Sequence, residues 1–179
     1  MNLANKLTLL RIIMIPVFVV VLLSGYYYGA AAVFVIASLT DMLDGYIARK
    51  YNMITDFGKL MDPLADKLLV TAALVALVEL GDIQSWMVIV ILSREFTVSI
   101  LRAVAASSGK VIAASKWGKA KTIVQMIAII AILFKNQPFE ILNIPFAQGA
   151  LYLAVALTII SGVDYIYKNK EFFSEKGEA

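Results

Sequence analysis

The chain has 179 residues, of which 61% are hydrophobic and 16% charged, with a net charge of +3 and a mean hydropathy of +0.83. Soluble domains are about half apolar and about a quarter charged, so this composition excludes a disordered chain or a coiled coil and disfavours an ordinary cytosolic globule. The sequence has no cysteine and no histidine, which excludes a disulfide framework, a thiolate metal site and an imidazole base. Catalysis would have to use carboxylates, lysine, arginine, hydroxyls or a bound metal ion.

Six apolar stretches are long enough to cross a bilayer, which takes roughly 20 residues in a helix. None of them alternates between apolar and polar residues as a strand would. We therefore predict an all-α integral membrane protein with six transmembrane helices, forming a single membrane-embedded catalytic domain over residues 1–179. The first stretch is expected to be a span rather than a cleaved signal peptide, because no small-residue cleavage site precedes Tyr26. The predicted spans cover about residues 7–24, 29–50, 59–80, 84–106, 117–134 and 147–167.

The distribution of basic residues predicts the orientation of these spans. An even number of spans places both termini on one side, and every lysine and arginine except Lys135 falls on that side. Basic residues are enriched in cytosolic loops, so both termini are predicted to be cytosolic. The protein is accordingly expected to be a multi-pass protein of the cytoplasmic membrane.

Four aspartates lie in the predicted cytosolic halves of the second and third spans. Asp41 and Asp44 are spaced i,i+3, and Asp62 and Asp66 are spaced i,i+4, so each pair shares one helical face. Four converging carboxylates repel one another unless a cation is present, and oxygen ligands without His or Cys favour a hard ion. The pattern predicts a polar cavity that opens to the cytosolic leaflet and holds two divalent cations, Mg²⁺ or Mn²⁺, as in two-metal phosphoryl transfer.

Two structural alternatives remain open at this point. The aspartates could form buried ion pairs with nearby basic residues, and the small residues around them could serve close helix packing rather than ligand approach. The basic residues in question are Arg49, Lys59 and Lys67, and the small ones are Gly45, Ala48 and Gly58.

The aspartates belong to a longer pattern with fixed spacing. Residues 41–66 read Asp41-x2-Asp44-Gly45-x2-Ala48-Arg49-x8-Gly58-x3-Asp62-x3-Asp66. This pattern resembles the signature of the CDP-alcohol phosphotransferase (phosphatidyltransferase) family, and the six predicted spans extend the resemblance over nearly the whole chain. The resemblance implies a membrane enzyme, commonly a homodimer, that moves a phosphoalcohol group from a CDP-linked donor to an acceptor hydroxyl and releases CMP.

The resemblance also implies a role for each residue of the pattern. All four aspartates would bind metal, Asp62 and Asp66 would be catalytic, and Asp66 would act as general base for attack on the β-phosphorus of the donor. The residues expected to bind the CDP donor are Asp41, Asp44, Gly45, Ala48, Arg49 and Gly58.

A second group of charged residues indicates the acceptor. The fourth and fifth spans carry more basic residues than a CDP diester needs, against Glu95 alone, and an acceptor with its own phosphate would explain the excess. Lys67 of the third span adds to this excess. The basic residues concerned are Lys67, Arg94, Arg102, Lys116, Lys119 and Lys121. By position and charge, the residues expected to bind the acceptor phosphate are Thr55, Lys59, Arg94, Lys116 and Lys119.

Three looser patterns resemble the bacterial phosphatidylglycerophosphate synthase branch of the same family. They are Arg94-Glu95 with Arg102, Ser115-Lys116-Trp117-Gly118-Lys119-x-Lys121-Thr122-x2-Gln125, and Asn5-x2-Thr8-x2-Arg11-Ile12. This resemblance implies transfer of the phosphatidyl group from CDP-diacylglycerol to glycerol 3-phosphate, which gives phosphatidylglycerophosphate and CMP.

Other interpretations of the same residues stay open. Within the family, the acceptor could be inositol phosphate, phosphatidylglycerol or another alcohol. A cation-coupled transporter would also place carboxylates within apolar spans. The basic residues could simply follow the positive-inside rule, with Arg94 and Arg102 paired to Glu95 or Asp164. No nucleic-acid partner is expected.

Overall fold

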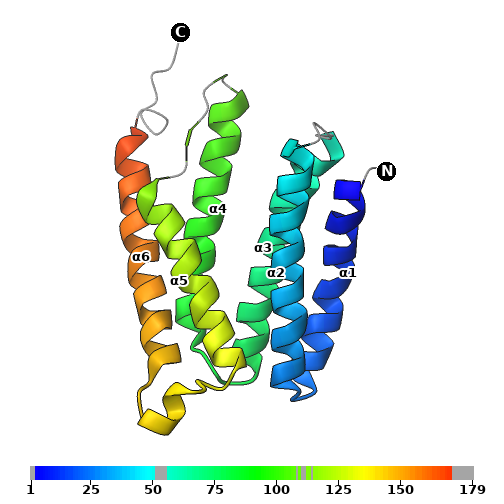
Figure 1. Ribbon diagram of the computed structural model, residues 1–179. Helices are drawn as coiled ribbons and strands as arrows, with labels where there is room; N and C mark the ends of the chain where they lie inside the picture. Colours follow the sequence, from blue (N-terminus) through cyan, green and yellow to red (C-terminus); the bar gives the residue numbers. More distant parts are fainter. Residues whose placement is uncertain (1–2, 51–55, 108, 110–111, 114, 171–179) are drawn as a thin grey trace. The chain divides into compact units, whose positions relative to one another are not determined.

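The computed structural model describes residues 3–50, 56–107, 109, 112–113 and 115–170, and their side chains from residue 6 onward except those of residues 41–50, 56–60, 62 and 63. Within these ranges the chain is helical and contains no strand, which confirms the all-α prediction for the described residues (Figure 1). Each predicted span coincides with one helix to within four residues at either end. The helices are α1 (Leu3–Leu23), α2 (Tyr27–Lys50), α3 (Asp56–Glu79), α4 (Ser85–Ser107), α5 (Lys116–Leu133) and α6 (Phe146–Lys168), with the 3-10 helix η1 (Phe139–Leu142) before α6.

Two of these helices satisfy by themselves the length and hydropathy needed to cross a membrane. Among the described residues they are Lys6–Leu23 of α1 and Phe146–Lys168 of α6, and Tyr27–Thr40 of α2 is a shorter apolar segment. The helices are thus compatible with a membrane protein, while the prediction of six spans remains a prediction.

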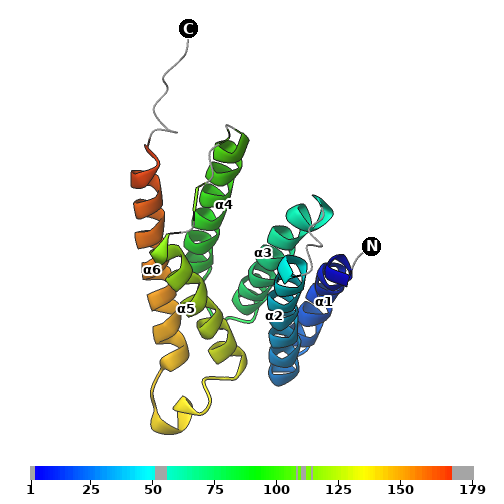
Figure 2. The same ribbon diagram turned by 45° about the horizontal axis from the view of Figure 1, so that its top comes forward.

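The chain divides into two compact units, and α5 contributes residues to both. The first unit comprises Met1–Ile83 and Ile129–Ile144, and the second comprises Gln84–Ala128 and Pro145–Ala179. In the first unit, α1 packs against both α2 and α3, which also contact each other (Figures 1 and 2). The rings of Phe18 and Phe34 lie with their centroids 5.6 Å apart in its core. Small side chains let the helices approach closely, and the fully buried alanines are Ala30, Ala31, Ala37, Ala65 and Ala73.

Glycines end α1 and α3 and explain why the turns that follow are short. Gly25 has a φ of +83° and Gly81 a φ of +78°, a backbone conformation that other residues rarely adopt. After α1, the amide of Gly25 donates to the carbonyl of Leu22 and the amide of Tyr26 to that of Val21. This is the Schellman arrangement, which satisfies the last carbonyls of a helix and reverses the chain.

A polar contact joins the N-terminal end of α2 to the segment that follows α3. The Tyr27 hydroxyl donates to Asp82 Oδ2 over 2.7 Å, and Lys135 Nζ lies 3.3 Å from the centroid of the Tyr27 ring. Tyr27 precedes the predicted span 29–50, and burial together with the Asp82 hydrogen bond raises the pKa of its hydroxyl to about 12. The phenol therefore stays protonated near neutral pH and links the start of α2 to the segment that follows α3.

The second unit is built on the packing of α4 against α6. The buried residues of α4 lie along one face of the helix: Met87, Val88, Ile91, Val98, Leu101 and Ala105. Those of α6 likewise lie along one face: Ala147, Leu151, Ala154, Val155, Thr158, Ser161 and Tyr165. Position 94 falls on this face of α4, so the helical period places an arginine where an apolar residue would otherwise pack.

We predict that Tyr27→Phe destabilises the first unit. Loss of this partly buried hydrogen bond costs about 1 kcal/mol, which corresponds to a decrease of roughly 2–4 °C in the unfolding midpoint of a chain of this size. The measurement is thermal unfolding of the purified protein in detergent. Tyr152→Phe is the matched control, because Tyr152 is half exposed on α6. Equal midpoints for both variants would contradict the role given to the Tyr27–Asp82 contact.

Candidate functional site

The aspartate pattern lies on two helices of the first unit, at matching depths. Helix α2 ends at Lys50 and α3 begins at Asp56, and both are regular through the pattern. With a rise of about 1.5 Å per residue, Asp44 and Asp62 each lie roughly 9 Å from these helix ends, and Asp41 and Asp66 roughly 14–15 Å from them. Because α2 and α3 contact each other, their backbones bring the two aspartate pairs to the same level of the unit.

Asp66 is the member of the aspartate pattern whose side chain is described, and it is exposed. For the other residues predicted to bind metal, donor or acceptor between positions 41 and 62, the structure does not describe the side chains. Thr55 lies outside the described residues altogether. Those with a described helical backbone are Asp41, Asp44, Gly45, Ala48, Arg49, Gly58, Lys59 and Asp62. Their assignment as site residues therefore remains a prediction.

The donor set of this pattern fits a hard divalent cation. It offers carboxylate oxygens alone, since the sequence contains neither histidine nor cysteine. Among the described side chains no three acidic residues gather closely enough to hold a metal ion. Of the four aspartates, Asp66 alone has a described side chain, so the metal centre remains a prediction.

Helix α1 brings a buried positive charge into the same unit. The side chains of Arg11 and Thr8 are fully buried, one helical turn apart on α1. Arg11 lies about 18 Å along α1 from Leu23, and the same rise along α2 from Tyr27 reaches residue 39. Arg11 is therefore close to the level of Asp41. From the sequence, Arg11 is predicted only as a basic residue near the N-terminus and as part of the pattern Asn5-x2-Thr8-x2-Arg11-Ile12.

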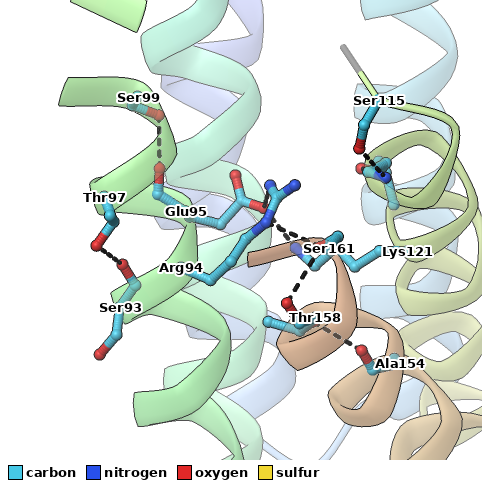
Figure 3. A network of polar contacts seen from close by, with 12 residues as sticks. Ser93, Arg94, Glu95, Thr97, Ser99, Ser115, Lys121, Ala154, Thr158 and Ser161 are labelled. Atoms are coloured by element: carbon cyan, nitrogen blue, oxygen red, sulfur yellow. Dashed lines mark hydrogen bonds and ion pairs between the residues drawn. The ribbon is translucent and has the colours of Figure 1, made fainter. Parts of the chain in front are cut away.

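Arg94 of α4 is the centre of a polar network in the second unit. Its side chain is 11% exposed, and its Nε donates to Ser161 Oγ on α6 over 3.0 Å. Ser161 Oγ in turn donates to the carbonyl of Thr158 over 3.1 Å. Figure 3 shows Arg94 and Glu95 from α4, Lys121 from α5 and Ser161 from α6 directed toward one another.

Glu95 connects this network to α5. Its Oε1 lies 2.5 Å from Lys121 Nζ and 3.4 Å from Arg94 Nη1. The Lys121 side chain is only 2% exposed, so its charge needs a partner inside the protein. Lys121 is included in the excess of positive charge inferred from the sequence. In the structure, the Glu95 carboxylate compensates the charge of Lys121.

The first turn of α5 lies directly against Arg94. Ser115 caps this turn, since its Oγ accepts a hydrogen bond from the amide of Gly118 over 3.1 Å. A Cβ at Gly118 would lie 3.0 Å from Arg94 Nη2. The same turn carries Lys116 and Lys119, which are both exposed. The structure thus places Arg94 beside the turn that carries Lys116 and Lys119, two of the other residues predicted to bind the acceptor phosphate.

The other basic residue of α4 has a different partner from those considered in the sequence. The Arg102 guanidinium lies 5.7 Å from the centroid of the Tyr165 ring, a cation–π contact. Asp164 instead accepts a 2.7 Å ion pair from Lys168 on its own helix. The sequence leaves open that Arg94 and Arg102 pair with Glu95 or Asp164. Among the described contacts, only the Arg94–Glu95 pair is present.

Two residues of α6 that support Arg94 were not identified from the sequence. Ser161 holds Arg94 Nε, and a Cβ at Gly162 would lie 3.3 Å from Arg94 Cγ. Serine and glycine are common in apolar helices, so no sequence pattern distinguishes these two residues. Their role in supporting Arg94 follows only from the packing of α6 against α4.

Comparison with known proteins identifies the chain. The family model for CDP-alcohol phosphatidyltransferases matches residues 1–160. The CDP-diacylglycerol–glycerol-3-phosphate 3-phosphatidyltransferase of Bacillus subtilis is 49% identical over 95% of this chain and 96% of that protein. The protein of the same name from Rickettsia bellii is 39% identical over 96% and 97%, and a probable phosphatidylglycerophosphate synthase of Mycobacterium tuberculosis is 44% identical over 92% and 80%. The chain therefore belongs to the CDP-alcohol phosphatidyltransferase family.

Proposed function

We propose that this enzyme transfers the phosphatidyl group of CDP-diacylglycerol to glycerol 3-phosphate, giving phosphatidylglycerophosphate and CMP. The observation that carries the proposal is the 49% identity, over nearly the full chain, to a relative named for this reaction. The clustering of Arg94 with the lysine-bearing first turn of α5 supports an acceptor that carries a phosphate.

The donor is proposed to bind along the pattern that spans residues 41–66. Family members use divalent metal ions, and two Mg²⁺ or Mn²⁺ ions held by Asp41, Asp44, Asp62 and Asp66 would neutralise the pyrophosphate and stabilise the CMP leaving group. The small residues Gly45, Ala48 and Gly58 let the donor approach the helix backbone, and Arg49 pairs with its phosphates.

Proton transfer is assigned to Asp66, with Asp62 beside it on the same helix. The acceptor hydroxyl attacks the β-phosphorus of CDP-diacylglycerol, and Asp66 takes the hydroxyl proton while the bond to CMP breaks. A base must be reachable by the acceptor, and the exposed Asp66 side chain agrees with this role.

The acceptor phosphate is proposed to bind Thr55, Lys59, Arg94, Lys116 and Lys119. Arginine binds phosphate through two parallel N–H groups, and lysines add charge without a fixed geometry. The argument from structure rests on Arg94, whose guanidinium lies beside the turn that carries Lys116 and Lys119.

The membrane arrangement is part of the same proposal. We propose that all six helices span the cytoplasmic membrane, that both termini and the active site face the cytosol, and that residues 1–179 act as one catalytic domain in a homodimer. The apolar character of α1 and α6 and the basic residues at the predicted cytosolic ends support this arrangement.

The choice of acceptor can be tested by CMP release. Purified protein in detergent is supplied with CDP-diacylglycerol, Mg²⁺ and one acceptor at a time: glycerol 3-phosphate, inositol phosphate, serine or phosphatidylglycerol. Of these four acceptors, we expect only glycerol 3-phosphate to stimulate CMP release. Preference for another acceptor would keep the family and refute the proposed substrate, whereas cation flux in vesicles without CMP release would favour a transporter.

Removal of divalent metal is expected to stop this reaction. Chelation with EDTA should reduce CMP release to background, and added Mg²⁺ or Mn²⁺ should restore it, because four carboxylates cannot hold a pyrophosphate without cations. The measurement is the rate after dialysis into metal-free buffer. A rate that persists in protein shown to be metal-free by elemental analysis would refute the two-metal site.

Neutral substitutions in the pattern should abolish turnover without unfolding the protein. For Asp66→Asn we expect a loss of about 10²–10⁴-fold in kcat, the range for removal of a general base, and for Asp62→Asn a loss of similar size because a metal ligand is removed. Glu140→Gln, an exposed carboxylate on η1, is the control. Thermal unfolding establishes that each variant is folded. Activity near that of the wild type in either aspartate variant would remove it from the active site.

A further inference from the structure

Glu95 has two basic partners, and they differ in how accessible they are. Lys121 is 2% exposed and Arg94 is 11% exposed, while Glu95 itself is 25% exposed. In the described contacts one carboxylate faces two cations, so these three side chains together carry a net charge of about +1. Since Glu95 lies closest to the deeply buried lysine, Arg94 is the one of the two cations whose charge is directed to an incoming anion.

Arg94 is held on several sides by groups of all three helices. Ser161 Oγ accepts from its Nε over 3.0 Å, and Glu95 Oε1 lies 3.4 Å from its Nη1. Gly162 and Gly118 leave space for its Cγ and its Nη2, where a Cβ would approach to 3.3 and 3.0 Å. The contacts fix the plane of the guanidinium and leave Nη2 beside the first turn of α5.

We propose that Glu95 and Ser161 are positioning residues for acceptor binding: they orient Arg94 toward a phosphate bound at the first turn of α5, and Lys121 balances Glu95 instead of touching substrate. This inference rests on the proposed function. Two-point recognition of a phosphate depends on the orientation of the guanidinium plane, so supporting contacts are as necessary as the arginine itself. Arg94 is the residue that contacts the phosphate, and Glu95 and Ser161 act through it.

The test separates positioning from charge balance by a double variant. Glu95→Gln alone leaves Lys121 buried without its Glu95 partner and is expected to destabilise the protein. In E95Q/K121M both charges are gone, so the unfolding midpoint should return close to that of the wild type. The KM for glycerol 3-phosphate should nevertheless rise about tenfold, because a neutral amide replaces the carboxylate and Arg94 loses the charge-assisted contact that orients it. The KM for CDP-diacylglycerol should stay unchanged.

Two further variants probe the other supports of Arg94. Ser161→Ala removes the acceptor of the Nε hydrogen bond and should also raise the KM for glycerol 3-phosphate selectively, by about three- to tenfold. Gly118→Ala should do the same by displacing Nη2. Gly149→Ala on α6 is its control, since no atom lies within 4 Å of a Cβ there. D164N/K168M is the control for the double variant, because it removes another lysine–carboxylate pair of the second unit.

The possible results distinguish the inference from the function on which it rests. A wild-type protein that releases no CMP with glycerol 3-phosphate would overturn the proposed function and the role of Arg94 together. If the wild type uses glycerol 3-phosphate and E95Q/K121M keeps the wild-type KM, Glu95 only balances Lys121 and the positioning role is wrong. Equal rises in the KM for both substrates, or a rise in the D164N/K168M control, would point to a general structural effect and would also overturn it.

Discussion

Compensation of buried charge is the constraint on which this helical protein depends. An ionised side chain withdrawn from water costs several kcal/mol unless a counter-charge or hydrogen bonds replace its hydration. Lys121 is almost fully buried and lies against Glu95, which also reaches Arg94. These contacts connect α4 to α5, and the Arg94–Ser161 hydrogen bond connects α4 to α6. The polar network thus ties three apolar helices together while it concentrates charge where a phosphate is proposed to bind.

Small residues make such networks possible. Gly118 and Gly162 allow α5 and α6 to approach the Arg94 side chain to distances that a methyl group would obstruct. In the first unit, buried alanines such as Ala37 and Ala65 allow α1, α2 and α3 to approach closely. Helices that approach closely can place short aspartates from different elements at one level, which longer side chains between them would prevent.

The chemistry follows from the residue types that the chain provides. Because the chain has no histidine or cysteine, the proposed proton transfer and metal binding are assigned to carboxylates, and the proposed anion binding to arginine and lysine. The residues proposed for these roles lie in both units: the aspartate pattern is on α2 and α3 of the first, and Arg94 with the first turn of α5 is in the second.

The sequence alone determined the helices, the aspartate pattern and the family. Apolar length and helical periodicity are local properties, so the six predicted spans coincide with α1 to α6, and fixed spacing along the sequence is enough to recognise the pattern at residues 41–66. The tertiary structure decided which charges meet: Glu95 with Lys121, Arg94 with Ser161, and Arg102 with the Tyr165 ring. These partners are 26 to 67 residues apart, and their choice depends on how helix faces pack, which no local pattern specifies.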